Sequence, residues 1–229
     1  MPAFPFAMVG FDLDGTLLDT AADLGAAVNR ALASAGRAPV PAEAVAGLIG
    51  GGAQRMLQRA LEITGGPVGE AELDRLFAIL LEHYESNIAV HTVPYPGLLT
   101  ALDALRDAGA VLAVATNKRE GMARKVLAVT GLIDRFAHVL GGDTLGPGRG
   151  KPAPDLLLEM ARRCGGGRAA FVGDSSFDVR AARAAGMPCI AVRFGFNDAP
   201  ADQLGADAVI DRFEDLIPAL HSLAPAALR

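Results

Sequence analysis

The chain of 229 residues is long enough for one large domain or for one domain that carries an insert. Hydrophobic residues make up 51% of it and its formal net charge is −5, so a sizeable core can form, but the basic surplus that nucleic-acid binding needs is lacking. The N-terminal stretch MPAFPFAMVGFD has no basic leader, and no apolar run reaches the roughly 18 residues of a membrane helix. We therefore expect a soluble cytoplasmic protein without a nucleic-acid or membrane partner.

The first apolar run, residues 7–11, predicts a buried strand, and the segment that follows it is helical. Amphipathic helices are predicted from Thr20 to about Ala35, over 54–63 and over 72–84. Thr20 and Asp23 have the spacing of an imperfect capping box at the start of the first helix. Residues 20–93 show no strand pattern. We expect them to form a helical domain whose crossings to the rest of the chain, near residues 19–20 and 93–96, are candidate hinges.

From residue 94 onward, short apolar runs alternate with helical patterns. The runs are continuous rather than alternating, as is typical of strands whose sheet is covered on both faces. The strands are predicted over 110–115, 138–140, 169–172, 189–192 and 208–210, and the helices over 97–108, 119–129, 154–163 and 178–185. This alternation predicts an α/β fold in which residues 1–19 and 94–229 form a core with a parallel sheet. Cys164 and Cys189 lie outside any Cys-x-x-Cys pattern and are expected to be reduced packing residues.

Four polar clusters follow predicted strands, where open parallel sheets bind their ligands. The clusters hold Asp12 and Asp14, then Thr116, Asn117 and Lys118, then Lys151, and finally Asp174 and Asp178. Each cluster alone has a simpler explanation, since Asp-x-Asp and Gly-Asp-Ser are common in turns, Thr-Asn caps helices and Lys-Pro occurs in surface loops. Their order after successive strands favours a common site.

Carboxylates gathered at strand ends repel one another unless a cation lies between them. Asp12, Asp14 and Asp174 offer hard oxygen ligands, which with a phosphate substrate favour Mg²⁺ over zinc. The four histidines share no ligand spacing and are expected to be structural or surface residues: His83, His91, His138 and His221.

A metal lets a carboxylate approach an anionic phosphate group, because the metal offsets charge on both. Asp12 is then placed to act as a nucleophile that forms an aspartyl-phosphate, and Asp14 to act as the general acid and base. Thr116 and Lys151 can hold the phosphate oxygens that are not transferred.

The stretches FDLDGTLLDT, ATNK, the lysine of GKPAPD and VGDSSFD resemble the four ordered motifs of the haloacid-dehalogenase superfamily, across essentially the whole chain. The resemblance implies a Rossmann-like core with an inserted helical cap. It also implies that Asp12 is the nucleophile and Asp14 the acid and base, that Thr116 and Lys151 bind the phosphoryl group together with the neighbouring Asn117, and that Mg²⁺ is the cofactor. The implied metal ligands are Asp12, the backbone carbonyl of Asp14, and Asp174, with Asp178 in support.

The second aspartate separates branches of this superfamily. Its dehalogenases lack an Asp two positions after the nucleophile, so Asp14 favours phosphate-ester chemistry. The stretches IGGGAQRML, VLGGDTLGPGRGKPAPDLL and RFGFND are most similar to phosphoglycolate phosphatases, although here residues 145–150 intervene before the lysine. We expect a phosphatase of a small metabolite, 2-phosphoglycolate first. A sugar-phosphate phosphatase, a pyrophosphatase, a β-phosphoglucomutase-like mutase and a binding module without catalysis are the alternatives.

Three glycines precede the helix that begins near Ala53, and free N–H groups at a helix start favour anions. If the cap closes over the site, Gly51 and Gly52 could meet the carboxylate of the substrate, and Arg55 could do so with its guanidinium. A flexible turn with Arg55 in solvent is the equal alternative. The sequence leaves monomer and homodimer open.

Overall fold

Six parallel strands form the central sheet of the computed structural model, which describes residues 4–224. Their order across the sheet is β5-β4-β1-β6-β7-β8. The strands are β1 (Met8–Phe11), β4 (Val111–Ala115), β5 (His138–Leu140), β6 (Ala169–Gly173), β7 (Cys189–Val192) and β8 (Ala208–Ile210). The α/β fold class with a parallel sheet is therefore confirmed, and each predicted strand lies within one or two residues of its expected bounds.

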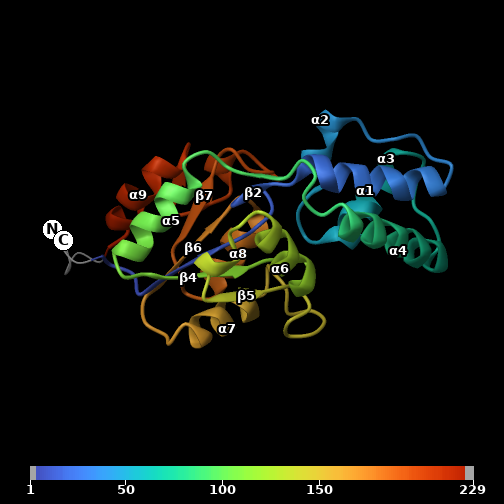
Figure 1. The fold of residues 1–229 in the computed structure, drawn as a ribbon. Coiled ribbons are helices and arrows are strands. Elements are labelled where there is room, and N and C mark those ends of the chain that lie inside the picture. The colour runs from blue at the N-terminus through green and yellow to red at the C-terminus, as the bar shows by residue number, and fades with distance from the viewer. Residues whose placement is uncertain (1–3, 225–229) are drawn as a thin grey trace.

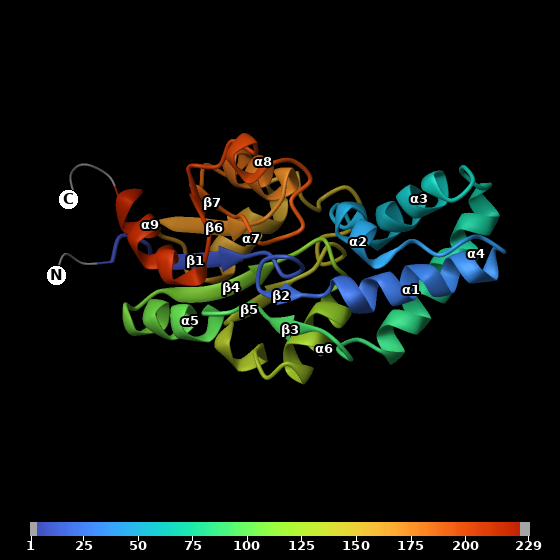
Figure 2. The same ribbon diagram turned by 90° about the horizontal axis from the view of Figure 1, so that it is seen from above.

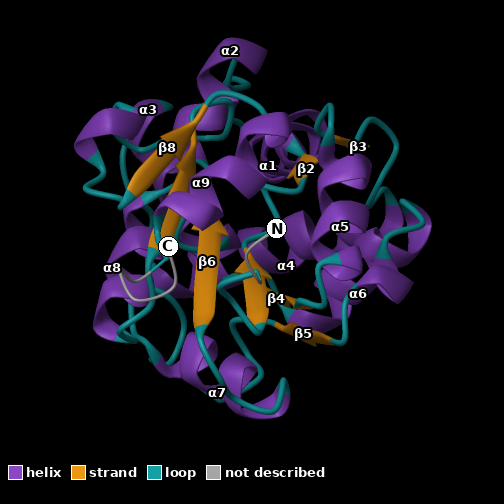
Figure 3. Cartoon of the chain, turned by 90° about the vertical axis from the view of Figure 1, so that its left-hand side faces the viewer, coloured by secondary structure: helices purple, strands orange, loops and turns teal. Residues whose placement is uncertain are grey.

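Helices cover both faces of this sheet (Figures 2 and 3). Residues of α7 (Asp155–Arg163) and α8 (Ser176–Ala184) pack in one apolar cluster on one face. Those of α5 (Leu98–Asp107), α6 (Glu120–Val129) and α9 (Leu216–Ser222) pack in a second cluster on the other. Burial on both faces is the physical reason why the strands are continuously apolar. Short 3₁₀ helices complete this part of the chain: Ile133–Arg135, Ala201–Gln203 and Phe213–Asp215.

A group of helices lies beyond one end of the sheet (Figure 1). It contains α1 (Ala21–Ser34), α2 (Ala42–Val45), the 3₁₀ helix Ala46–Leu48, α3 (Ala53–Ile63) and α4 (Glu70–Ser86). We call residues 21–86 the helical insert. Its apolar residues, such as Leu32, Leu57 and Leu76, are buried where α1, α3 and α4 pack against one another. The division into domains at residues 20 and 93 stays a prediction.

Two short strands that the sequence pattern missed join the insert to the core. β2 (Leu18–Asp19) and β3 (Val93–Pro94) pair antiparallel, with Leu18 opposite Pro94 and Asp19 opposite Val93. The two crossings of the chain are therefore held side by side. Strands of two residues carry no periodic signal, which is why the pattern of the sequence did not predict them.

The capping box predicted at the start of α1 is wrong. Thr20 occupies the N-cap position but makes no capping hydrogen bond, and its hydroxyl instead donates to Asp14 Oδ1 at 2.8 Å. The Asp23 carboxylate accepts hydrogen bonds from the backbone of His91 and from the backbone and hydroxyl of Thr92. Both side chains therefore bind partners on other segments in preference to the local helix end.

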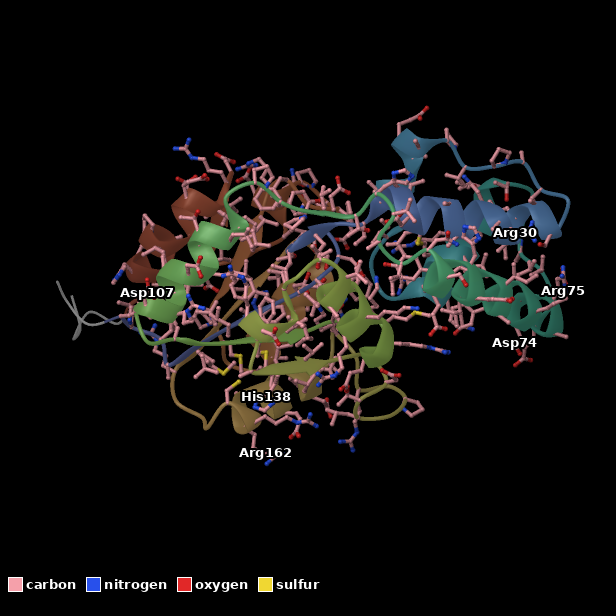
Figure 4. All side chains as sticks on the ribbon, in the orientation of Figure 1. Arg30, Asp74, Arg75, Asp107, His138 and Arg162 are labelled. Carbon is pink, nitrogen blue, oxygen red and sulfur yellow. The ribbon has the colours of Figure 1, made fainter. Side chains whose placement is uncertain are left out.

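Helix α8 begins two residues earlier than predicted, because Ser175 and Asp178 form a capping box there. Both cysteines are free thiols, as expected. His138, labelled in Figure 4, lies on β5 away from the insert and contacts the carbonyl of Arg163 through Nε2 at 3.0 Å, which fits a structural role. Within residues 4–224, no helix combines the length and the apolar character that a membrane crossing requires.

Candidate active site

The polar clusters predicted from the sequence meet at the carboxyl ends of three adjacent strands. β1 lies between β4 and β6, in parallel register with both. Asp12 follows β1, Thr116 follows β4 and Asp174 follows β6. The chain leaves β1 to build β4 and β5 on one side and returns to build β6 on the other, which makes this the switch point where such sheets bind ligands.

Lys151 links two of the aspartates across the site. Its ammonium lies 2.8 Å from Asp12 Oδ1 and 2.6 Å from Asp178 Oδ1. The lysine is only 4% exposed, and burial of an ammonium is costly unless it is paired. The two carboxylates offset that cost and raise the pKa of Lys151 against the opposing effect of burial, so the lysine stays charged.

Asp174 and Asp178 are held by short hydrogen bonds. Asp174 Oδ2 accepts from the backbone N–H of Phe196 at 2.6 Å, and Oδ1 accepts from the Thr16 hydroxyl at 3.2 Å. Asp178 Oδ2 accepts from the backbone N–H and the hydroxyl of Ser175 at 3.0 and 2.6 Å. The capping box of α8 thus fixes the carboxylate that in turn holds Lys151.

Three buried carboxylates form a candidate metal site. Asp12, Asp174 and Asp178 each place one oxygen so that all three oxygens lie within 4.8 Å of one another. Burial is the largest cause that raises the pKa of Asp12 to about 6 and the pKa of Asp174 well above its usual range. With Lys151 counted, the cluster keeps two formal negative charges, and its hard oxygen donors fit a divalent cation such as Mg²⁺.

Gly15 permits the close approach of the first loop to this cluster. It has a φ of +82°, in the left-handed region that favours glycine. A Cβ at this position would overlap Asp174 Oδ2. Glycine is therefore required at position 15, because a side chain there would overlap the carboxylate of Asp174.

The Asp14 carboxylate lies outside the three-carboxylate group and faces another lysine. Lys118 Nζ donates to Asp14 Oδ1 at 2.7 Å and to Oδ2 at 2.8 Å, and Thr20 donates to Oδ1. That the backbone carbonyl of Asp14 binds the metal, as the family resemblance implies, stays a prediction. The sequence placed Lys118 in the second polar cluster but gave it no role, because no local pattern distinguishes a buried, paired lysine from a solvated one.

Thr116 and Asn117 lie in the loop after β4. Thr116 is buried, and its hydroxyl accepts from the backbone N–H of Lys118 at 3.3 Å. The Asn117 amide donates to the carbonyl of Lys151 at 2.8 Å, which joins two of the predicted phosphate-binding loops. The structure thus brings Asn117 to the site but turns its amide nitrogen toward the protein.

A cavity of about 800 Å³ lies between the strand ends and the helical insert. The side formed by the insert, which we call the insert wall, comprises Leu24, residues 49–54, Met56, Phe77 and Leu81. Gly51 and Gly52 belong to this wall, whereas Arg55 does not line the cavity. The Arg55 guanidinium instead lies 5.3 Å from the ring centre of Phe177 on the core. Residues 146–148 and 150, from the loop that departs from the family pattern, line the cavity as well.

Comparison with known proteins shows what the whole chain is similar to. The model of the haloacid dehalogenase-like hydrolases matches residues 6–186. A phosphoglycolate phosphatase of Agrobacterium fabrum is 42% identical over 96% of this chain and 93% of its own, and one of Rhodospirillum rubrum is 39% identical over 90% and 87%. A crystal structure described as a predicted phosphoglycolate phosphatase from Haemophilus somnus has a TM-score of 0.86 at 30% identity, covering 93% of this chain and 97% of that one.

Proposed function

The chain belongs to the haloacid dehalogenase-like hydrolase family, and from this premise we propose that it is a Mg²⁺-dependent phosphatase of a small phosphate monoester, with 2-phosphoglycolate as its substrate. The relatives that carry the name phosphoglycolate phosphatase are 36–42% identical over at least 90% of the chain, which supports the choice of substrate. The chain spans 78–98% of the length of these relatives.

One observation carries the proposal. A carboxylate, an ammonium and a buried threonine, Asp12, Lys151 and Thr116, meet at one end of the sheet beneath a cavity. An ammonium at this place can bind the oxygens of a phosphate group, and a carboxylate beside it can attack the phosphorus.

The donor set supports Mg²⁺ as the cofactor. Asp12, Asp174 and the carbonyl of Asp14 would hold the ion, and Asp178 would support it through Lys151 and the capping box. When bound, Mg²⁺ would offset the negative charge of both the carboxylates and the phosphate group.

In the first step, an Asp12 oxygen attacks phosphorus, so that an Asp12 O–P bond forms while the bond to the ester oxygen breaks. Asp14 gives a proton to the departing ester oxygen, which leaves as an alcohol. Lys151 and Thr116 hold the phosphate oxygens that do not react.

In the second step, Asp14 takes a proton from a water molecule whose oxygen attacks the phosphorus of the aspartyl-phosphate. The bond between Asp12 and phosphorus breaks, the carboxylate is restored, and inorganic phosphate leaves. Asp14 returns to the protonation state in which it began.

The insert is proposed to act as a cap that moves over the site. The cavity of about 800 Å³ has room for about 25 water molecules at ~30 Å³ each, far more than a two-carbon ester fills. Closure would exclude this water and bring Gly51 and Gly52 to the carboxylate of the substrate, where free N–H groups favour an anion.

The test is phosphate release with Mg²⁺ from a panel that contains 2-phosphoglycolate, several sugar phosphates and pyrophosphate. We expect the highest kcat/KM with 2-phosphoglycolate. Asp12→Asn should lower kcat by at least ~10⁴-fold while circular dichroism stays unchanged, because Lys151 keeps its contact with Asp178. Near-normal turnover in this variant would remove Asp12 from the role of nucleophile.

The alternatives give different results in the same assays. Preference for a sugar phosphate or for pyrophosphate would reassign the substrate, and isomerisation of a hexose 1-phosphate in the presence of a bisphosphate primer would indicate a mutase. No phosphate release from any member of the panel would contradict the proposal. The cytoplasmic location and the choice between monomer and homodimer stay predictions.

A further inference from the structure

Lys118 is a buried cation that the proposed mechanism does not use. It follows β4, and its side chain is only 6% exposed. Its ammonium contacts both oxygens of Asp14, at 2.7 and 2.8 Å. The ammonium fixes where the carboxylate lies, and the hydrogen bond from the Thr20 hydroxyl to Oδ1 sets its rotation. Removal of either partner would leave a buried charge without its counter-ion.

The two oxygens of Asp14 differ in their surroundings. Oδ1 accepts hydrogen bonds from both Lys118 and Thr20, whereas the contacts recorded for Oδ2 among residues 4–224 come from Lys118 alone. Each carboxylate oxygen can accept about two hydrogen bonds, so Oδ2 retains acceptor capacity that Oδ1 has used. Since Asp14 lines the cavity, Oδ2 is the oxygen available to exchange a proton with a substrate.

The helical insert also contacts the Lys118 ammonium. The ring of Tyr84, on α4, lies 4.6 Å from the Lys118 ammonium and is 2% exposed. A desolvated cation over an aromatic ring is attracted to it. The ammonium is therefore held between a carboxylate of the core and a ring of the insert, where α4 runs close to α6 (Figure 1).

We propose that Lys118 is a positioning residue that holds Asp14 Oδ2 in place for proton transfer. Through its contact with Tyr84, Lys118 also makes this position depend on where the helical insert lies. The inference rests on the proposed function. Asp14 carries the proton in both steps, while Lys118 neither gives nor takes one. Thr20, at the start of the insert, fixes Oδ1 from the other side.

The proposal predicts a loss that depends on the leaving group. An alkoxide leaves poorly without a proton, whereas p-nitrophenolate leaves readily without one. Lys118→Met should therefore lower the first-turnover rate of glycolate release from 2-phosphoglycolate by ~10²-fold, and the first-turnover release of nitrophenolate from p-nitrophenyl phosphate by less than ~10-fold. In the Asp14→Asn background, Lys118→Met should cause no further loss, because the group that it positions is gone.

Lys125→Met is the matched control. Lys125 also reaches α4 from α6, with its ammonium 2.7 Å from the carbonyl of Glu85, but it does not touch Asp14. This variant should keep both rates. Thr20→Val, which loses the donor to Oδ1 without removing a charge, should show the same dependence on the leaving group to a smaller degree.

Equal losses on the two esters, or a further loss of ~10-fold or more in the Asp14→Asn background, would overturn the proposal. Should Lys118→Met fail to fold, Thr20→Val decides the matter by the ratio of the two ester rates. The proposed function is judged by a different measurement, the turnover of the wild type against Asp12→Asn, so that the two conclusions can fail separately.

Discussion

The two sides of the cavity are built in different ways. On the strand-end side, Asp174, Asp178 and Lys151 are buried, and each makes at least two short polar contacts with the core. On the insert wall, the turn at residues 50–52 consists of three glycines with positive φ. The side that would perform the chemistry, which we call the rigid side, is charged and tied by hydrogen bonds. The insert wall, which we call the adaptable side, is mostly apolar and contains the glycine turn. On the proposed function, reaction type and substrate choice would depend on separate parts of the chain.

The largest expected effect tests the rigid side. Lys151→Met removes the ammonium between Asp12 and Asp178, so that buried carboxylates repel one another. In metal-free protein the free energy of unfolding should fall by about 3–5 kcal/mol, measured by urea denaturation. Lys125→Met, at an exposed position, should change it by less than ~0.5 kcal/mol. A loss below ~1 kcal/mol for Lys151→Met would show that this side does not depend on the ion pairs.

The next effect is the stabilisation by Mg²⁺ and its dependence on pH. Burial raises the pKa of Asp12 to about 6. Between the usual carboxyl pKa of about 4 and this value, the metal-free folded state therefore keeps a proton that the unfolded state has lost. That proton stabilises the metal-free fold at low pH, and the contribution is lost as the pH rises through about 6. Because Mg²⁺ needs the ionised carboxylates, its stabilising effect should grow over the same range.

Melting temperatures with Mg²⁺ and with a chelator, compared at about pH 5 and about pH 8, measure this effect. At Mg²⁺ concentrations about 100-fold above Kd, the gain should approach ~2.7 kcal/mol at the higher pH and be much smaller at the lower. Asp12→Asn should weaken the dependence on pH. An equal gain in stability at both pH values would show that Mg²⁺ does not bind to the carboxylate cluster.

The smallest effect tests the adaptable side. Gly51 has a φ of +76°, and a Cβ there would lie 3.0 Å from Phe177 Cζ. Gly51→Ala should cost ~1–2 kcal/mol of stability and raise KM for 2-phosphoglycolate more than it lowers kcat. Gly36→Ala is the matched control, since Gly36 has a φ of +66° in the insert and nothing within 4 Å of its Cβ. It should cost similar stability and leave KM unchanged. Equal changes of KM in both variants would count against a role for the turn.

The strands and the strand-end clusters could be predicted because buried parallel strands are continuous apolar runs and their carboxyl ends share one edge of a sheet. The order of Asp12, Thr116, Lys151 and Asp174 along the chain was therefore enough to expect that they meet. The contacts between distant segments could not be predicted. Thr20 has the local signature of a helix cap, yet Asp14 competes successfully for its hydroxyl.

Lys118 is a second example of a contact that could not be predicted from the sequence. Its partners, Asp14 and Tyr84, lie 104 and 34 positions away in the chain, and neither pairing follows a helical or strand period. Which insert residues line the cavity was equally hard to predict. Arg55 is next to lining residues in the sequence, yet its guanidinium lies over the ring of Phe177, a core residue that itself lines the cavity.

The pairing of β2 with β3 has a consequence for how such proteins diversify. Because Leu18 lies opposite Pro94, the chain leaves the core and re-enters it at neighbouring points, separated by about one strand spacing of ~5 Å. A segment of another length or shape can be exchanged between these points without a change in the register of the six-stranded sheet. Evolution, or an engineer, can therefore replace the insert, which we propose selects the ester, and keep the strand ends, where we place the hydrolysis.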